Sequence, residues 1–182
     1  MKVYAMLADG FEEVEAIAVI DLLRRDGVEV NTVSIMGRRA VTGAHQIRIE
    51  ADQTFEQTDF SEGDMIFLPG GMPGTKHLQA HEGLAQQLKQ YAEREDKWLA
   101  AICAAPSVLG SLGILKGKKA TCYPGFEEKL DGAILMEEPV VADGQIFTSR
   151  GVGTALDLGL AIVEVWSGRD EAAELSRGIQ YR

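Results

Sequence analysis

The amino-acid sequence predicts an α/β protein whose mostly parallel sheet carries helices on both faces. Apolar runs of strand length alternate with segments of helical periodicity, and glycine-containing turns follow several of the strand-like runs. The chain has 182 residues and 20 glycines, enough for one domain's core with many tight loops. No repeat, low-complexity stretch or linker divides it, so we expect one domain over residues 1–182.

Each expected element is a run with one periodicity, bounded by turn residues. Pro69-Gly70-Gly71 closes one strand, Pro106 suits the first turn of a helix, and Asp143-Gly144 is typical of a two-residue hairpin turn. In chain order we expect strand 3–8, helix 11–25, strand 28–35, a hairpin of residue 41 with 46–49, strand 65–68, helix 78–95, strand 98–102, helix 107–115, strand 120–122, a hairpin of 139–142 with 145–149, and helix 154–166.

The composition excludes several classes of partner. A formal charge of −10 without a basic cluster argues against binding to nucleic acid or to an anionic membrane surface. The chain has two cysteines, no signal peptide and no apolar stretch long enough to span a membrane. We therefore expect a cytoplasmic protein with free thiols, although Cys103 and Cys122 can still meet in space.

Cys103 is the first candidate for chemistry, because it lies where a buried strand turns into a helix. Unpaired N–H groups and the positive end of a helix dipole favour the nucleophilic thiolate. We therefore expect a thiol pKa well below the ordinary value of about 8.5. The alternative is an inert cysteine buried among alanines, which the pattern favours equally.

Glu15 is the second candidate, because its helical position turns a carboxylate toward the apolar face of helix 11–25. An inward carboxylate needs a partner or a raised pKa, and both are typical of functional sites. The alternative is a carboxylate at the rim that reaches solvent. Asp9 with Glu12 matches a capping box, and Glu13 lies in the first turn, so these acids have expected structural roles.

Two loops at strand ends can contribute to a site. Backbone N–H groups near Gly70 and Gly71 can form an oxyanion hole with the N–H that follows Cys103, although Pro-Gly-Gly is more often only a turn. Arg150 follows the strand at 145–149 and can bind an anionic substrate, pair with an acid at an interface or remain solvated. Thr154 with Asp157 matches a helix cap.

Four segments together resemble the ThiJ/PfpI (DJ-one) superfamily, in the branch of the human Parkinson-disease protein deglycase and bacterial YajL. These segments are ADGFEEVE at 8–15, LPGG at 68–71, AAICAAP at 100–106 and TSRGVGT at 148–154, and they occur in the family's order. The resemblance implies a flavodoxin-like three-layer sandwich, a nucleophile-elbow cysteine at Cys103, a protonated partner at Glu15, backbone donors near Gly71 and Ala104, and a homodimer.

Two departures from the family pattern matter. A histidine follows the cysteine in the protease-like branches, but Ala104 stands here, so peptidase activity is not expected. Tyr123 occupies the place of a histidine in the Parkinson-protein pattern, and a neutral tyrosine is a poor proton shuttle near pH 7. His45 lies in another segment. His77 and His81 are four residues apart, but we expect a solvated helix face there and no metal site.

The resemblance implies a cofactor-independent glyoxalase or deglycase that acts on carbonyls such as methylglyoxal, or on glycated protein, through Cys103 and Glu15. The alternative is a redox sensor or chaperone that responds to oxidative stress through oxidation of Cys103. A third reading is a dimeric scaffold with an incidental thiol. Val14, Ile17 and Ala18, on the otherwise polar side of helix 11–25, can supply the dimer contact.

Overall fold

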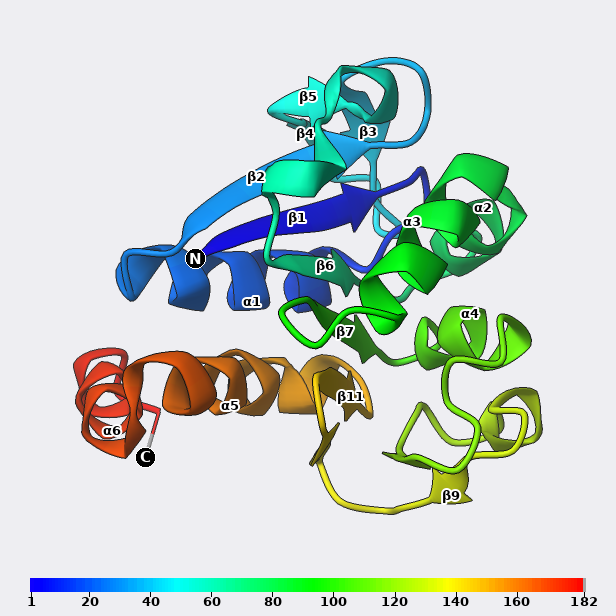
Figure 1. Cartoon of the computed structure of the whole chain (residues 1–182). Helices are drawn as coiled ribbons and strands as arrows, with labels where there is room; N and C mark the ends of the chain where they lie inside the picture. The colour runs from blue at the N-terminus through cyan, green and yellow to red at the C-terminus, as the bar shows by residue number, and fades with distance from the viewer. Residues whose placement is uncertain (182) are drawn as a thin grey trace.

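The computed structural model describes residues 1–181, and its centre is a seven-stranded sheet in the order β10-β11-β7-β6-β1-β2-β5 (Figure 1). All neighbouring strands are parallel except β10 and β11 at one edge. The strands are β1 (Lys2–Leu7), β2 (Glu29–Ser34), β5 (Gln53–Thr54), β6 (Met65–Leu68), β7 (Trp98–Ile102), β10 (Val140–Asp143) and β11 (Ile146–Ser149).

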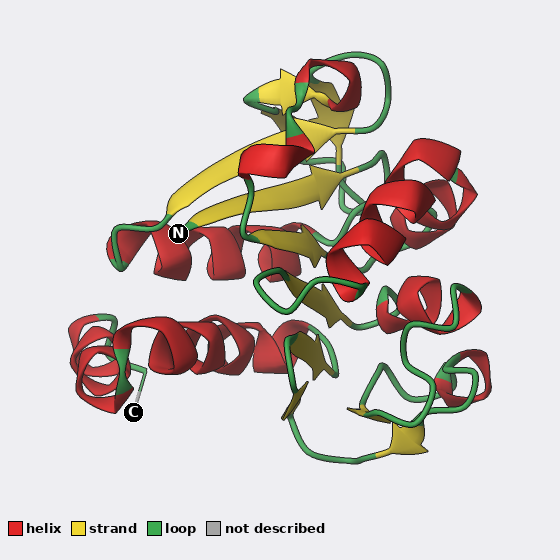
Figure 2. Ribbon diagram, in the orientation of Figure 1, coloured by secondary structure: helices red, strands yellow, loops and turns green. Residues whose placement is uncertain are grey.

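Helices cover both faces of this sheet (Figure 2). One layer contains α1 (Glu13–Arg25), α5 (Ala155–Ser167) and α6 (Arg169–Gly178). The other contains α2 (Gly74–Ala80), α3 (Glu82–Ala92) and α4 (Pro106–Ser111). Short 3-10 turns lie at Phe55–Gln57, Phe60–Glu62, Glu127–Lys129 and Val152–Thr154. The expected three-layer α/β sandwich is therefore confirmed.

The central strands read as continuous apolar runs because both of their faces are buried. Along β1, Val3, Ala5 and Leu7 pack in the core under α1 and α5, whereas Tyr4 and Met6 pack in the core under the other helices. Two small ladders lie outside the main sheet. The antiparallel pair β3 (Ala40–Thr42) and β4 (Arg48–Glu50) confirms the first expected hairpin, and β8 (Lys119–Ala120) pairs in parallel with β9 (Ile134–Leu135).

Several expected helices differ in length from those in the structure. The helix expected at 78–95 is two helices that meet at His81, whose Nδ1 accepts a hydrogen bond from the Leu84 N–H and so begins α3. The helix at 107–115 shrinks to six residues, and α6 follows α5 after the left-handed Gly168. None of the helices within residues 1–181 is both long and apolar enough to cross a membrane.

Both expected helix caps are wrong. Glu12 precedes α1 without a side-chain cap, and Asp9 instead accepts hydrogen bonds from the Thr42 N–H and from Arg38. Thr154 makes no side-chain cap for α5, because its hydroxyl is bonded to Gly151 in the preceding loop and to Ser149 at the end of β11. In both places the polar side chain holds a loop at the carboxyl end of the sheet, which is the end that carries the pocket.

Candidate functional site

A pocket of about 780 Å³ opens at the carboxyl ends of the parallel strands. It adjoins the place between β1 and β6 where the chain changes its direction across the sheet, a usual ligand site in such folds. The expected residues that line it are Glu15, Gly71, Cys103, Ala104, Tyr123 and Arg150. Six of the seven candidate residues therefore line the pocket, from segments far apart in the sequence, and the seventh, Gly70, is hydrogen-bonded to Glu15.

Cys103 occupies a sharp turn between β7 and α4. Its φ of 64° is in the left-handed region, which a residue with a side chain adopts only when its surroundings impose it. Two backbone hydrogen bonds hold the turn: the Cys103 N–H donates to the Ser149 carbonyl (2.9 Å), and the Tyr123 N–H donates to the Cys103 carbonyl (2.8 Å). The sulfur is half-buried, and the N–H groups of Ala104 and Gly71 are close enough to lower the pKa of the thiol.

Glu15 projects from α1 into the same site and is completely buried. Its Oε2 accepts a hydrogen bond from the Gly70 N–H (3.0 Å), and the Cys103 thiol is close enough to lower the pKa of the carboxyl group. No partner for Oε1 is found within residues 1–181. Burial raises the pKa of the carboxyl group from 4.5 to about 7, because the surroundings penalise its charged form.

The thiol of Cys103 shares a proton with this carboxyl group. Burial and the nearby charge of Glu15 raise the thiol pKa to about 12, and the two backbone N–H donors only partly offset this. The expected low thiol pKa is therefore wrong. The short α4 begins three residues after the cysteine, so its dipole is weak at sulfur, whereas the carboxylate is in contact. Between the two pKa values the pair holds one proton.

Gly70 and Gly71 have different tasks in the loop after β6. A Cβ on Gly70 would lie 2.6 Å from the Cβ of Cys103 and 2.7 Å from Glu15 Oε2, so a side chain would separate the pair. The Gly70 N–H holds Glu15 and is not offered to a ligand, which corrects its expected place among the oxyanion donors. Gly71, at φ 91°, is the residue of this loop whose N–H lowers the thiol pKa of Cys103.

Tyr123 and Arg150 lie at the mouth of the pocket. The Tyr123 side chain is half exposed, and its ring lies close to Gly151. Arg150 donates to the Glu137 carbonyl (3.3 Å), which leaves most of its guanidinium donors for other partners. Cys122 is a buried free thiol that packs in the core under α2–α4, whereas Cys103, also free, packs against the core under α1 and α5.

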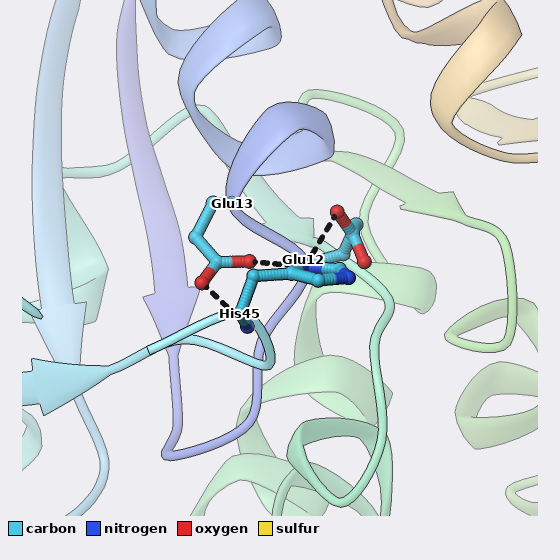
Figure 3. A group of neighbouring side chains, drawn as sticks. All are labelled: Glu12, Glu13 and His45. Carbon is cyan, nitrogen blue, oxygen red and sulfur yellow. Dashed lines mark hydrogen bonds and ion pairs between the residues drawn. The ribbon is translucent and has the colours of Figure 1, made fainter. Parts of the chain in front are cut away.

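His45 also lines the pocket, although no sequence pattern predicts it there. It lies between β3 and β4, and its ring is beside the carboxylates of Glu12 and Glu13 (Figure 3). The Nδ1 atom is 3.0 Å from Glu13 Oε2 and 3.5 Å from Glu12 Oε1. Of the residues that the structure describes, these three form the group whose ligand atoms, all within 4.8 Å of one another, have a spacing suited to a metal ion.

Comparison with known proteins identifies the family. A model of the DJ-1/PfpI family matches residues 1–165. The chain belongs to the DJ-1/PfpI family. The resemblance to the ThiJ/PfpI superfamily and the flavodoxin-like sandwich that it implied are thereby confirmed.

Relatives in the DJ-1/PfpI family match almost all of the chain. Protein DJ-1 homolog B of Arabidopsis thaliana is 40% identical over 177 residues, which are 96% of this chain and 40% of that protein. Deglycase PH1704 of Pyrococcus horikoshii is 34% identical over 152 residues, 82% of this chain and 90% of that protein. The chain spans less than half the length of the two Arabidopsis DJ-1 homologues that it matches.

A solved DJ-1 structure has the same fold. Oxidized DJ-1 from Toxoplasma gondii gives a TM-score of 0.94 at 32% identity, over 99% of this chain and 98% of that one. The two folds therefore agree along nearly the whole length, including the segments that carry the pocket.

Proposed function

We propose that this protein is a cofactor-independent glyoxalase or deglycase-type enzyme that acts on reactive carbonyls such as methylglyoxal or on glycated proteins. The observation that carries the proposal is the buried Glu15 carboxyl group beside the Cys103 thiol, with the backbone N–H groups of Ala104 and Gly71 close enough to the sulfur to favour its thiolate. This arrangement combines a nucleophile, a proton carrier and oxyanion donors in one pocket.

In the proposed reaction the single proton of the pair moves to Glu15, and the Cys103 thiolate attacks the aldehyde carbon of methylglyoxal. The C–S bond forms, and the carbonyl electrons pass to oxygen beside the N–H groups of Gly71 and Ala104. Glu15 returns its proton to this oxygen and, now a carboxylate that can take a proton near pH 7, removes the proton from the former aldehyde carbon to leave an enediolate. It then delivers that proton to the former ketone carbon, and the hydroxyl proton on the first carbon passes to the oxygen of the second. The product is a lactoyl thioester, and water releases lactate from it.

The first experiment measures lactate formed from methylglyoxal by the wild type, Cys103→Ser and Glu15→Gln. We expect the wild type to form lactate and both variants to lose turnover, because each removes one member of the pair. A deglycation assay with a methylglyoxal-modified peptide then tests the second substrate class, since Deglycase PH1704 is similar over 82% of this chain. Lactate formation that persists in Cys103→Ser would refute the proposed nucleophile.

A second candidate function is redox sensing or chaperone action through oxidation of Cys103. The same two N–H donors and a protonated Glu15 can hold the oxygen atoms of a sulfenic or sulfinic acid. The decisive comparison is Glu15→Gln, which keeps a hydrogen-bond donor of similar shape but cannot carry a proton. Full lactate turnover in this variant would remove the acid/base role and favour the sensor.

We also propose a homodimer. An apolar surface, the α1 patch, joins α1 to the β3–β4 hairpin and is made of Val14, Ile17, Ala18, Ile47 and Ile49. Its members Val14, Ile17 and Ile47 are each about half exposed. An isologous contact between two copies would remove this surface from water.

A further inference from the structure

The two oxygen atoms of the buried Glu15 carboxyl group have different surroundings. Oε2 is on the cysteine side: it accepts the Gly70 N–H (3.0 Å), and a Cβ on Gly70 would lie 2.7 Å from it and 2.6 Å from the Cys103 Cβ. Oε1 has no hydrogen-bond partner within residues 1–181. A buried polar atom without a partner is costly, so Oε1 marks a place on the pocket wall where a ligand can supply the missing hydrogen bond.

Gly151 shows which part of the pocket Oε1 faces. A Cβ on Gly151 would lie 3.8 Å from Glu15 Oε1 and 3.3 Å from Cδ2 of the Tyr123 ring. Glu15, Gly151 and Tyr123 all line the pocket. The missing side chain of Gly151 therefore leaves a space between a free carboxyl oxygen and an aromatic ring, and we call this space the Gly151 subsite.

Hydrogen bonds tie the Gly151 subsite to the turn that carries Cys103. The Tyr123 N–H donates to the Cys103 carbonyl (2.8 Å), and the Cys103 N–H donates to the carbonyl of Ser149, two residues before Gly151 (2.9 Å). The Thr154 hydroxyl accepts the Gly151 N–H (3.1 Å) and braces the loop from its other side. Because one carboxyl group borders Cys103 with one oxygen and Gly151 with the other, a substrate bonded to the sulfur reaches the subsite.

We propose that the Gly151 subsite selects the substrate: the carbon next to the aldehyde lies over Gly151, and its apolar substituent packs against the Tyr123 ring. Oε1 is the oxygen of Glu15 that exchanges protons with the two reacting carbons, and the substrate hydroxyl supplies its missing hydrogen bond. The substrate class is therefore 2-oxoaldehydes that carry an apolar substituent. This inference rests on the proposed function, in which such a substrate is bonded to the Cys103 sulfur.

The wall of the subsite favours an apolar substituent over a hydrogen atom. The Tyr123 side chain is half exposed, so an apolar group placed on its ring removes apolar surface of both from water. The pocket of about 780 Å³ leaves room for more than a methyl group. We therefore expect kcat/KM of the wild type to rise from glyoxal to methylglyoxal and from methylglyoxal to ethylglyoxal, because each step adds one carbon to the contact.

The test measures kcat/KM for these three aldehydes through the hydroxy acids that they form. Gly151→Ala puts a methyl group into the subsite, and we expect the ratio of kcat/KM for ethylglyoxal to that for glyoxal to fall about 10-fold. Tyr123→Ala should lower the same ratio because the ring is lost, whereas Tyr123→Phe should keep it because the ring remains. The matched control is Gly153→Ala, whose Cβ would meet no atom of residues 1–181 within 4 Å and which should keep the wild-type ratio.

Alkylation of Cys103 tests the subsite without turnover. Gly151→Ala should slow N-phenyliodoacetamide relative to iodoacetamide, measured by peptide mass mapping, because the phenyl group needs the subsite. An aldehyde ratio that stays unchanged in Gly151→Ala or in Tyr123→Ala would overturn the inference, and so would equal alkylation selectivity in Gly151→Ala and the wild type. If the alkylation selectivity changes but the wild type forms no hydroxy acid from any of the three aldehydes, the proposed function fails while the subsite stands.

Discussion

Replacing Glu15 by Gln should stabilise the protein at alkaline pH. Burial raises the pKa of the carboxyl group from 4.5 to about 7, so between these values the folded chain holds a proton that the unfolded chain has released. The stability of the wild type therefore falls as pH rises through this window and is constant above it. At about 1.4 kcal/mol per pH unit the loss is about 3 kcal/mol, and the neutral amide avoids it.

Urea unfolding from pH 4 to pH 8, in reductant, measures this difference. The free energy of unfolding of Glu15→Gln should equal that of the wild type below pH 4.5 and exceed it by about 3 kcal/mol near pH 8. This difference corresponds to roughly 6–12 °C in Tm. Glu174→Gln removes an exposed carboxylate from α6 and serves as the control without such an advantage. Parallel pH dependence of the wild type and Glu15→Gln would show that the buried carboxyl ionises without cost, and the shared-proton argument would fail.

Three further predictions address the thiol, the loop and the α1 patch. Glu15→Gln should speed iodoacetamide alkylation of Cys103 at pH 8, because it removes the negative charge that raises the thiol pKa. Peptide mass mapping measures the alkylation, and the buried Cys122 should react more slowly. Gly70→Ala should lose turnover and about 1–3 kcal/mol of stability, measured by lactate assay and urea unfolding, since its Cβ would overlap Cys103 and Glu15; unchanged turnover would contradict this. Ile17→Glu should give the 19.8 kDa monomer in light scattering while the wild type gives twice that mass, and a monomeric wild type would refute the dimer.

Much of the fold was predictable because buried parallel strands leave a strong apolar signal. The strands at 65–68 and 98–102 were expected with the bounds that the structure shows. The helix after Cys103 was overestimated, because apolar residues beyond Ser111 pack in turns rather than continue the helix. The break at His81 was also missed, since a histidine that caps a helix through its ring has no distinct sequence signal.

Site residues were predictable where a single helix or the end of a single strand determines which way a side chain points. Helical periodicity predicted that Glu15 points toward the core, and in the structure its side chain is completely buried. Long-range contacts could not be read in this way: Glu13 was expected to serve the helix dipole, yet it holds His45, which is 32 residues away. The prediction of a low thiol pKa was wrong for the same reason. The pKa of Cys103 depends in part on Glu15, which lies in a distant segment of the sequence.

The carboxylate of Glu13 also accepts the N–H of Ile47 (3.3 Å), in addition to its two contacts with His45. Ile47 belongs to the α1 patch, whereas His45 belongs to the pocket wall. The nearly buried side chain of Glu13 therefore binds both the pocket-lining part and the α1-patch part of the β3–β4 hairpin to helix α1. The pocket wall and the α1 patch therefore depend on the same contacts of Glu13. A substitution that removes these contacts between α1 and the hairpin should disorder both surfaces.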